Sequence, residues 1–222
     1  MRQRKAKDLE SRLQRCSEYM ARPPLPHGWR GCFENDHPLF LEIGCGKGNF
    51  IISKALAHPD RNFIAAEGQE TVILRALEKA RACEQEDRIR QEGRRLRNLR
   101  FLPAYIEDMA AFFEQDQLSG IFLNFSDPWP KARHAGRRLT HRKRLQSYGW
   151  VLKPGGFVEI KTDNDALYEF TLEEIAAVGY QVSEQTTDLH SSAFSSQYTT
   201  TEYEEKFRDR GKNINYVKIT VK

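Results

Sequence analysis

The sequence has few cysteines, no long hydrophobic run and no internal repeat. Its four cysteines, Cys16, Cys32, Cys45 and Cys83, form no C-x-x-C pair and have no histidine at zinc-site spacing. We therefore expect reduced thiols rather than metal ligands. No apolar stretch approaches the roughly 20 residues of a membrane span, and the polar, basic N-terminus lacks the apolar segment of a signal peptide. These absences favour a cytoplasmic protein with no metal and no membrane partner.

The length of 222 residues suits one large domain, or one domain and an arm. Hydrophobic residues make up 39% of the chain and aromatic residues 11%, which is enough for a real core. The net charge of +4 is a weak indicator of partners, but the cations come in blocks. The composition leaves open whether the protein is a monomer or a homodimer.

The first 37 residues differ from the rest of the chain. Residues 1–20 are polar and basic, with apolar residues at helical spacing, and residues 22–38 are rich in proline and glycine. We expect residues 1–37 to form a basic N-terminal helix or arm, followed by a linker or ordered loop. Residues 38–222 are expected to form the main domain.

From Leu39 onward, patterns typical of strands and helices alternate, which predicts a Rossmann-like α/β fold. In such a fold a mostly parallel sheet carries helices on both faces, and ligands bind at the carboxyl ends of the strands. The expected strands cover residues 39–43, 62–66, 99–103, 121–125 and 157–162, with further β-rich pieces near 180–182 and 216–221. The expected helices include residues 51–56, 71–83, 109–113, 139–152 and 167–178, and residues 153–156 are expected to form a turn.

A glycine-rich loop follows the first expected strand. It runs Glu42-Ile43-Gly44-Cys45-Gly46-Lys47-Gly48, and its glycines permit a tight turn and close approach of a ligand to the backbone. The third glycine comes one residue too early for the dinucleotide fingerprint G-x-G-x-x-G. The pattern E-x-G-x-G-x-G is instead typical of S-adenosylmethionine-dependent methyltransferases, and Glu67 after the second strand suits ribose hydroxyls. The alternative is an ordinary turn between a strand and a helix.

A carboxylate between rigid residues ends the fourth expected strand. The hydrophobic run 121–125 is followed by Ser126-Asp127-Pro128-Trp129-Pro130-Lys131. Pro128 fixes its own φ and disfavours a helical Asp127, so Asp127 is expected to lie extended at the strand end. A carboxylate, a flat ring and a cation together suit a guanine-like base on a polyanion. Trp129 is explained equally well by base stacking and by core packing.

Basic residues gather in three blocks. Residues 131–144 hold seven Lys or Arg, two His and no acid; residues 88–100 hold six Arg against one acid. Such clusters neutralise phosphates and release counterions, which favours RNA bound by shape and charge, with one captured base. A solvated helix face is the alternative, and His134 and His141 are interpreted as phosphate or structural partners. The third block comprises Arg2, Arg4, Lys5, Lys7, Arg12 and Arg15.

The segment Asn-Phe-Ser-Asp-Pro-Trp-Pro-Lys-x-Arg-His-x-x-Arg-Arg-Leu-Thr at 124–140 resembles the bacterial tRNA (guanine-N7-)-methyltransferases. The likeness begins at Leu41-Glu42-Ile43-Gly44, continues through residues 157–164, and reaches Thr201-Glu202-Tyr203-Glu204-Glu205-Lys206-Phe207. It covers most of the chain beyond about residue 36, and the signature D-P-W-P-K-x-R-H-x-x-R-R is specific to that family.

The resemblance implies a class I methyltransferase fold and methyl transfer from S-adenosyl-L-methionine to N7 of a guanine in the variable loop of tRNA. The products would be 7-methylguanosine and S-adenosyl-L-homocysteine. Family members usually carry an aspartate near the cofactor's adenine just after the third strand, where this chain has Ala104-Tyr105. The implied cofactor positions are Glu42, Gly44, Gly46, Gly48, Glu67, Tyr105 and Asp127. The implied substrate positions are Lys131, Asp163, Thr201, Glu202, Tyr203 and Glu204, to which the basic segment adds Arg133, Arg137 and Arg138.

The implied reaction has little need of a general base. Guanine N7 is a lone-pair acceptor without a proton, so its attack on a sulfonium methyl depends on alignment and electrostatics. A carboxylate would stabilise the positive charge that moves to the guanine ring. Asp127 and Asp163 are the candidates, and Asp127 is taken as the catalytic one. The alternatives are a turn-capping role for Asp127 and an N-cap role for Asp163.

Three other functions compete with this one. Methyltransferases of adenine amino groups often carry [DN]-P-P-[YFW] after the fourth strand, which Asp127-Pro128-Trp129 matches in part. A non-catalytic RNA-binding protein on a methyltransferase scaffold would not need the intact glycine loop with its two glutamates. A nicotinamide dehydrogenase fits the glycine spacing poorly.

Overall fold

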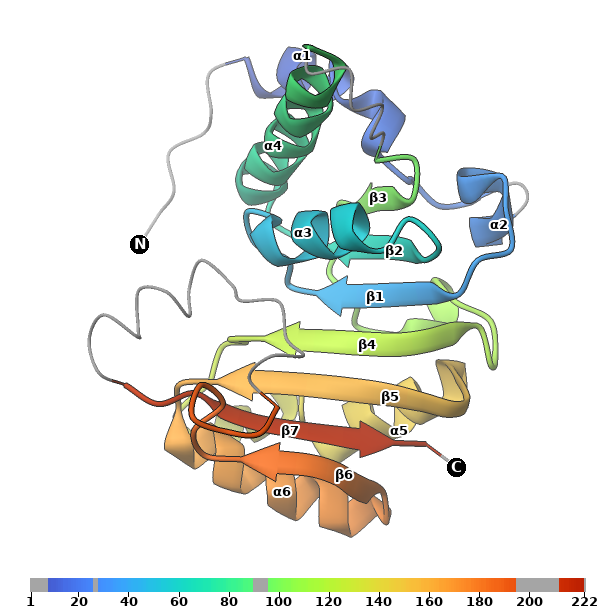
Figure 1. Cartoon of the computed structure of the whole chain (residues 1–222). Coiled ribbons are helices and arrows are strands. Elements are labelled where there is room, and N and C mark those ends of the chain that lie inside the picture. The colour runs from blue at the N-terminus through green and yellow to red at the C-terminus, as the bar shows by residue number, and fades with distance from the viewer. Residues whose placement is uncertain (1–7, 26–27, 90–95, 195–211, 222) are drawn as a thin grey trace. The chain divides into compact units, whose positions relative to one another are not determined.

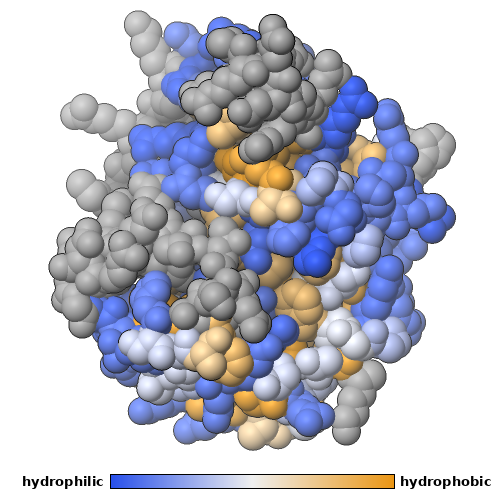
Figure 2. Space-filling view, viewed as in Figure 1, coloured by the Kyte–Doolittle hydropathy of each residue, from blue (hydrophilic) through white to orange (hydrophobic). Residues whose placement is uncertain are grey.

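The computed structural model describes residues 8–25, 28–89, 96–194 and 212–221. The chain forms two compact units, Met1–Ile106 and Glu107–Lys222. Each unit combines strands of a sheet with helices packed on them (Figure 1). On the face shown in Figure 2, hydrophilic residues predominate outside the grey atoms, and hydrophobic residues form smaller patches.

The first unit contains three parallel strands, β1 (Leu39–Ile43), β2 (Asn62–Ala66) and β3 (Leu99–Leu102). Every residue of β1 and β2 is buried, because parallel strands are covered on both faces and read as continuous hydrophobic runs. The strands match the predicted positions within one residue. Helix α3 (Asn49–Ala57) follows the glycine loop, and α4 (Glu70–Ile89) follows β2.

The N-terminal segment is docked on the first unit. It contains α1 (Leu9–Gln14), a 3-10 turn η1 (Ser17–Tyr19) and α2 (Gly28–Phe33). Arg12 makes two hydrogen bonds of 2.8 and 2.7 Å to the carboxylate of Glu78 on α4, and the Ala21 N–H donates to the Phe101 carbonyl at 2.8 Å. The region predicted as a linker or loop therefore includes a helix that buries Trp29 and Phe33.

The second unit contains β4 (Leu118–Asn124), β5 (Leu152–Thr162), β6 (Gln181–Thr186) and β7 (Asn215–Thr220). Strand β5 is parallel to β4, whereas β7 is antiparallel to both β5 and β6. Helix α6 (Asp165–Val178) packs on this part of the sheet and on α5 (Arg142–Val151). The described residues of this unit also form two 3-10 segments, η2 (Met109–Ala111) and η3 (Ala132–Arg137).

The strand order is β3-β2-β1-β4-β5-β7-β6 in a seven-stranded sheet. This confirms the predicted Rossmann-like, mostly parallel α/β fold. The predicted helix at 109–113 is a short 3-10 segment, and the predicted helix at 139–152 begins only at Arg142.

The expected turn at residues 153–156 is instead built into β5. Leu118 pairs with Leu152 and Gly120 with Phe157, so the residues between Leu152 and Phe157 form a bulge within the strand. The Gly155 N–H donates to the Val221 carbonyl at 2.9 Å, and Gly155 has a φ of 77°, which glycine adopts without strain. Long-range pairing with the chain end thus keeps a turn-type sequence in the sheet.

No helix in the described residues is long and apolar enough to span a membrane. Within the same residues, no group of three or more His, Cys, Asp or Glu side chains is placed to hold a metal ion.

A buried carboxylate connects α5 to α6. Glu174 is 4% exposed and accepts hydrogen bonds from Arg142, including one of 2.7 Å from its side chain and one of 2.5 Å from its backbone N–H. The hydrogen bonds from the Arg142 side chain hold the pKa of Glu174 below its ordinary value of 4.5. The stabilisation is therefore present above pH 4.5 and is lost as the pH falls through the lower, folded-state pKa.

We expect Glu174→Gln to lower Tm at pH 7 by several degrees and to flatten the loss of Tm below pH 4.5, because the glutamine has no proton to take up. Thermal unfolding followed by circular dichroism across pH 3–7 measures both effects. Glu173→Gln, at an exposed position of the same helix, is the matched control. An acid limb as steep in Glu174→Gln as in the wild type would contradict this account.

Candidate functional site

The glycine loop connects β1 to α3 and leans on the end of β2. The N–H groups of Gly44 and Cys45 both donate to the Ala66 carbonyl, at 2.8 and 3.0 Å. Gly44, Gly46 and Gly48 have φ values of 77°, 55° and 77°, which favour glycine. A Cβ at Gly44 or Gly46 would meet nothing within 4 Å, whereas a Cβ at Gly48 would lie 2.8 Å from the Ala76 side chain. The first two glycines thus leave open space for a ligand, and the third permits helix packing.

The surroundings of this loop are anionic. Glu42, next to the last residue of β1, is 2% exposed, and Glu67 directly follows β2 and is half-buried. Burial raises the pKa of the Cys45 thiol well above its ordinary value, and the nearby carboxylates of Glu42 and Glu67 raise it further. The two carboxylates beside the loop suit a ligand with positive charge and hydroxyl groups. This open, anionic cradle fits S-adenosylmethionine, which carries a sulfonium, an ammonium group and ribose hydroxyls.

A strained turn of residues 125–129, the corner, follows β4 in the second unit. The Phe125 N–H donates to the Lys161 carbonyl at 2.8 Å, which continues the pairing with β5 by one residue. Phe125 then takes a φ of 51° and Trp129 a φ of 40°. Positive φ at such residues costs about 1–3 kcal/mol each and is concentrated at functional sites. Asp127 lies exposed between them, where the sequence predicted it.

The side chain of Arg138 stabilises this corner by hydrogen bonds to its backbone. Its Nε donates to the Pro128 carbonyl at 3.0 Å and its terminal nitrogen donates to the Trp129 carbonyl at 3.2 Å. The same guanidinium lies 4.2 Å from the centroid of the Phe170 ring on α6. Arg138 is therefore half-buried and engaged with the backbone of the two residues that follow Asp127. The sequence did not predict these hydrogen bonds, because Arg138 lies well beyond Asp127 along the chain.

The other predicted cations face outward. Lys131, Arg133 and Arg137 are exposed on or beside η3. The Arg137 guanidinium lies 4.9 Å from the centroid of the Trp129 ring, and the His134 ring meets the same indole edge-on at 5.7 Å. Trp129 is thus half-buried within a local cluster. His141 has a structural part, because its Nδ1 accepts from the Lys143 N–H at 3.3 Å and caps α5.

Asp163 directly follows the end of β5 and is half-buried. The N-cap of α6 is Asn164 rather than Asp163, because the Asn164 side chain accepts from the Leu167 N–H at 2.8 Å. Capping therefore does not account for Asp163.

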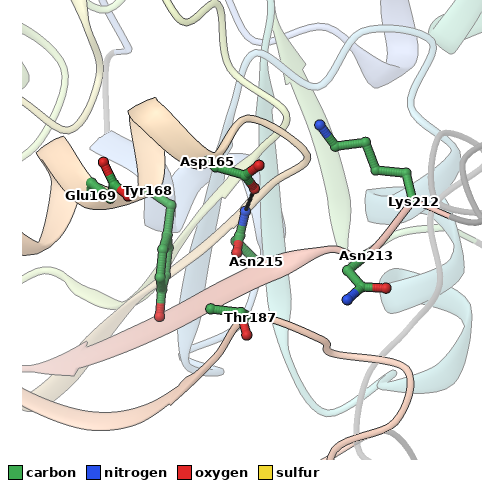
Figure 3. Close-up of a pocket in the computed structure, with 7 residues that line it drawn as sticks. All are labelled: Asp165, Tyr168, Glu169, Thr187, Lys212, Asn213 and Asn215. Carbon is green, nitrogen blue, oxygen red and sulfur yellow. Dashed lines mark hydrogen bonds between the residues drawn. The ribbon is translucent and has the colours of Figure 1, made fainter.

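A pocket of about 590 Å³ opens beside the first turn of α6. Figure 3 shows Asp165 accepting a hydrogen bond from Asn215, at 2.7 Å, with Tyr168 on the same helix. Burial raises the pKa of Tyr168. The pocket wall includes acids and amides, whose oxygens can accept hydrogen bonds from the donors of a base edge. Its walls are Asp165, Tyr168, Glu169, Thr187, Lys212, Asn213 and Asn215.

The structure places the predicted residues in two groups. The first unit holds Glu42, the three glycines, Glu67 and Tyr105, and the second unit holds Asp127, Asp163 and the cations of the 131–138 segment. Thr201, Glu202, Tyr203 and Glu204 lie outside the described residues, as do three of the six arginines of the 88–100 block. The pocket beside α6 was not predicted, since its walls come from three separate segments.

Comparison of the sequence with known families finds similar proteins over most of the chain. The family described as "Putative methyltransferase" matches residues 36–217. A protein from Brevibacillus brevis named tRNA (guanine-N(7)-)-methyltransferase is 40% identical over 99% of this chain and 98% of its own length. A protein of the same name from Mesoplasma florum is 46% identical over 80% of this chain and 78% of its own length.

Solved structures show the same fold at much lower identity. A 16S rRNA methyltransferase, KamB, superimposes with a TM-score of 0.65 at 13% identity, covering 89% of this chain and 94% of its own. An antibiotic-related methyltransferase gives a TM-score of 0.64 at 13% identity, covering 91% and 96%. At this identity the likeness establishes the fold alone, which is the predicted class I methyltransferase fold.

The Arg138 contacts predict a specific effect of Arg138→Lys. A lysine cannot bond both carbonyls in the same fork geometry, so the corner should loosen while the fold persists. We expect the indole N–H resonance of Trp129 to shift and broaden in heteronuclear NMR spectra, with little change in circular dichroism. Arg133→Lys, at an exposed position, should leave that resonance in place. Superimposable Trp129 signals in the wild type and Arg138→Lys would refute the role of Arg138.

Proposed function

Because the chain belongs to the tRNA (guanine-N(7)-)-methyltransferase family, we propose that it transfers a methyl group from S-adenosyl-L-methionine to N7 of a guanine in tRNA. The products are 7-methylguanosine and S-adenosyl-L-homocysteine. The target is proposed to be a guanine of the variable loop, and the enzyme to act in the cytoplasm. Residues 38–222 are proposed as the methyltransferase domain and residues 1–37 as its N-terminal arm.

The observation that carries this proposal is the strained corner around Asp127, in a chain that also has an open glycine loop between two carboxylates. The corner presents an exposed carboxylate and leads directly into a segment without acids. Two positive-φ residues and an arginine clamp keep it in a conformation that the local sequence does not favour. Such strain is consistent with a group that must be held in place for a reaction.

Cofactor binding is assigned to the residues of the glycine loop and its neighbours. The open faces of Gly44 and Gly46 admit the cofactor, and the carboxylates of Glu42 and Glu67 suit its ammonium and ribose hydroxyl groups. When bound, the cofactor supplies a methyl group on a positively charged sulfur. The loop residues bind and orient it, and Gly48 allows α3 to pack against α4.

Catalysis is proposed to rest on Asp127. Guanine N7 attacks with its own lone pair and has no proton to lose, so the protein does not need to supply a base. The ring becomes positively charged as the bond to N7 forms, and the Asp127 carboxylate stabilises that charge. Asp163 is proposed to accept the N–H groups of the guanine edge.

Binding of tRNA is assigned to the exposed cations and the segments beside them. Lys131, Arg133 and Arg137 are free of acidic neighbours in sequence and point outward, which suits phosphate contacts. The pocket beside α6 offers acids and amides to a base edge. Residues 201–204 complete the substrate positions proposed from the family resemblance. Arg138 was expected among the substrate positions because it lies in the basic segment, but its guanidinium is engaged by the Pro128 and Trp129 carbonyls.

We expect 7-methylguanosine to appear in unmodified tRNA after incubation with the protein and S-adenosyl-L-methionine. Nucleoside mass spectrometry detects the product directly, and digestion into oligonucleotides locates the modified guanine. Tritium uptake without 7-methylguanosine would indicate a different methylated atom. A methylated guanine outside the variable loop would correct the position but not the reaction.

We expect Asp127→Asn to lower kcat by about 100-fold, because it removes a charge from the transition state and keeps the shape of the side chain. Methyl transfer from tritiated cofactor to tRNA measures the loss. Asp116→Asn serves as a control, since Asp116 lies in the turn before β4. Turnover close to that of the wild type would rule out the electrostatic role.

A further inference from the structure

The aromatic ring of Tyr105 is unusually exposed. Among the described residues, only Tyr105 and Trp150 are large hydrophobic side chains on the surface, with 65% and 43% exposure. Tyr105 comes three residues after β3 ends, beyond a tight turn in which the Ala104 N–H donates to the Leu102 carbonyl at 2.9 Å. Its position is therefore set by the carboxyl end of a parallel strand, where ligands bind in this fold.

One face of the Tyr105 ring rests on Gly68. A Cβ built on residue 68 would collide with three atoms of the ring, so the ring packs directly against the backbone at that position. The Glu67 N–H donates to the Leu102 carbonyl at 3.1 Å, which joins the end of β2 to the end of β3. Glycine at residue 68 is thus required for the ring to lie where it does.

We propose that Tyr105, backed by Gly68, is the stacking platform for the adenine of the cofactor. The inference rests on the proposed function and assigns the base of that cofactor to these two residues. If Glu67 binds the ribose hydroxyls, the base attached to the same ribose lies within one ring width of the carboxylate. Gly68 is the next residue, and its partner Tyr105 offers an open aromatic face to a flat heterocycle.

Stacking on Tyr105 predicts that the enzyme discriminates little between the bases of cofactor analogues. A carboxylate at this place, as the family resemblance implied, would accept hydrogens from the amino group of adenine. Tyr105 instead offers a ring, and stacking on an aromatic ring tolerates different bases because every base has a π-face. This enzyme should therefore bind a cofactor analogue with hypoxanthine in place of adenine almost as well as the adenine form.

The experiment compares S-adenosyl-L-homocysteine with S-inosyl-L-homocysteine by isothermal titration calorimetry, without RNA. We expect the wild type to bind the two within about fivefold of each other. Tyr105→Ala should weaken both by about tenfold, whereas Tyr105→Phe should bind like the wild type. Tyr105→Asp should favour the adenine form over the hypoxanthine form, because it restores an acceptor for the amino group.

Gly68→Ala tests the backing of the ring. The added methyl would displace Tyr105, so it should weaken binding in the wild type but add little in the Tyr105→Ala background, where the ring is gone. Trp150→Ala removes the other exposed aromatic and should leave both affinities unchanged. Circular dichroism of each variant establishes that it is folded.

The results of these titrations distinguish failure of the Tyr105 platform from failure of the proposed methyltransferase function. Unchanged affinities in Tyr105→Ala would overturn the platform while the methyltransferase assignment stands. Equal losses of affinity in Tyr105→Phe and Tyr105→Ala would also overturn the platform, because they would assign the effect to the hydroxyl. A wild type that bound the hypoxanthine form more than about 100-fold more weakly than the adenine form would overturn it as well. A wild type that bound neither compound would overturn the proposed function and the platform together.

Discussion

The corner after β4 depends on one arginine that bonds to two consecutive carbonyls. Arg138 donates to Pro128 and Trp129 and rests on Phe170, so a residue of the basic segment becomes part of the support for Asp127. The positive φ of Phe125 and Trp129 would otherwise favour relaxation into a simpler turn. The basic segment after the corner therefore has two roles. Some of its cations are exposed to solvent, and Arg138 instead stabilises the backbone of the corner.

The charge pattern around the glycine loop of the first unit suits a cationic ligand. Carboxylates flank the loop, and the thiol within it is buried and kept neutral. A sulfonium compound would meet favourable charge there. A chain that methylates a nucleophile without a proton needs this charge complementarity more than it needs an acid or a base.

The N-terminal segment shows how a basic sequence can be structural. Arg12 belongs to one of the basic blocks, yet its guanidinium is engaged by Glu78 on α4. Leu13, Cys16 and Tyr19 are buried beside it, and Met20 forms a bridge with Phe101 at the edge of β3. The described part of this segment covers a sheet edge that would otherwise be open to pairing with another chain.

The sequence by itself determined the order of strands and helices, because buried parallel strands appear as mostly hydrophobic runs such as residues 39–43 and 62–66. It also placed Asp127 just after the fourth strand, since the hydrophobic run 121–125 ends before it. The bulge at 153–156, the clamp by Arg138 and the contact of Tyr105 with Gly68 were decided by the tertiary structure. Each joins residues that are distant along the chain or overrides a local preference, and no local pattern encodes which partner a side chain will meet.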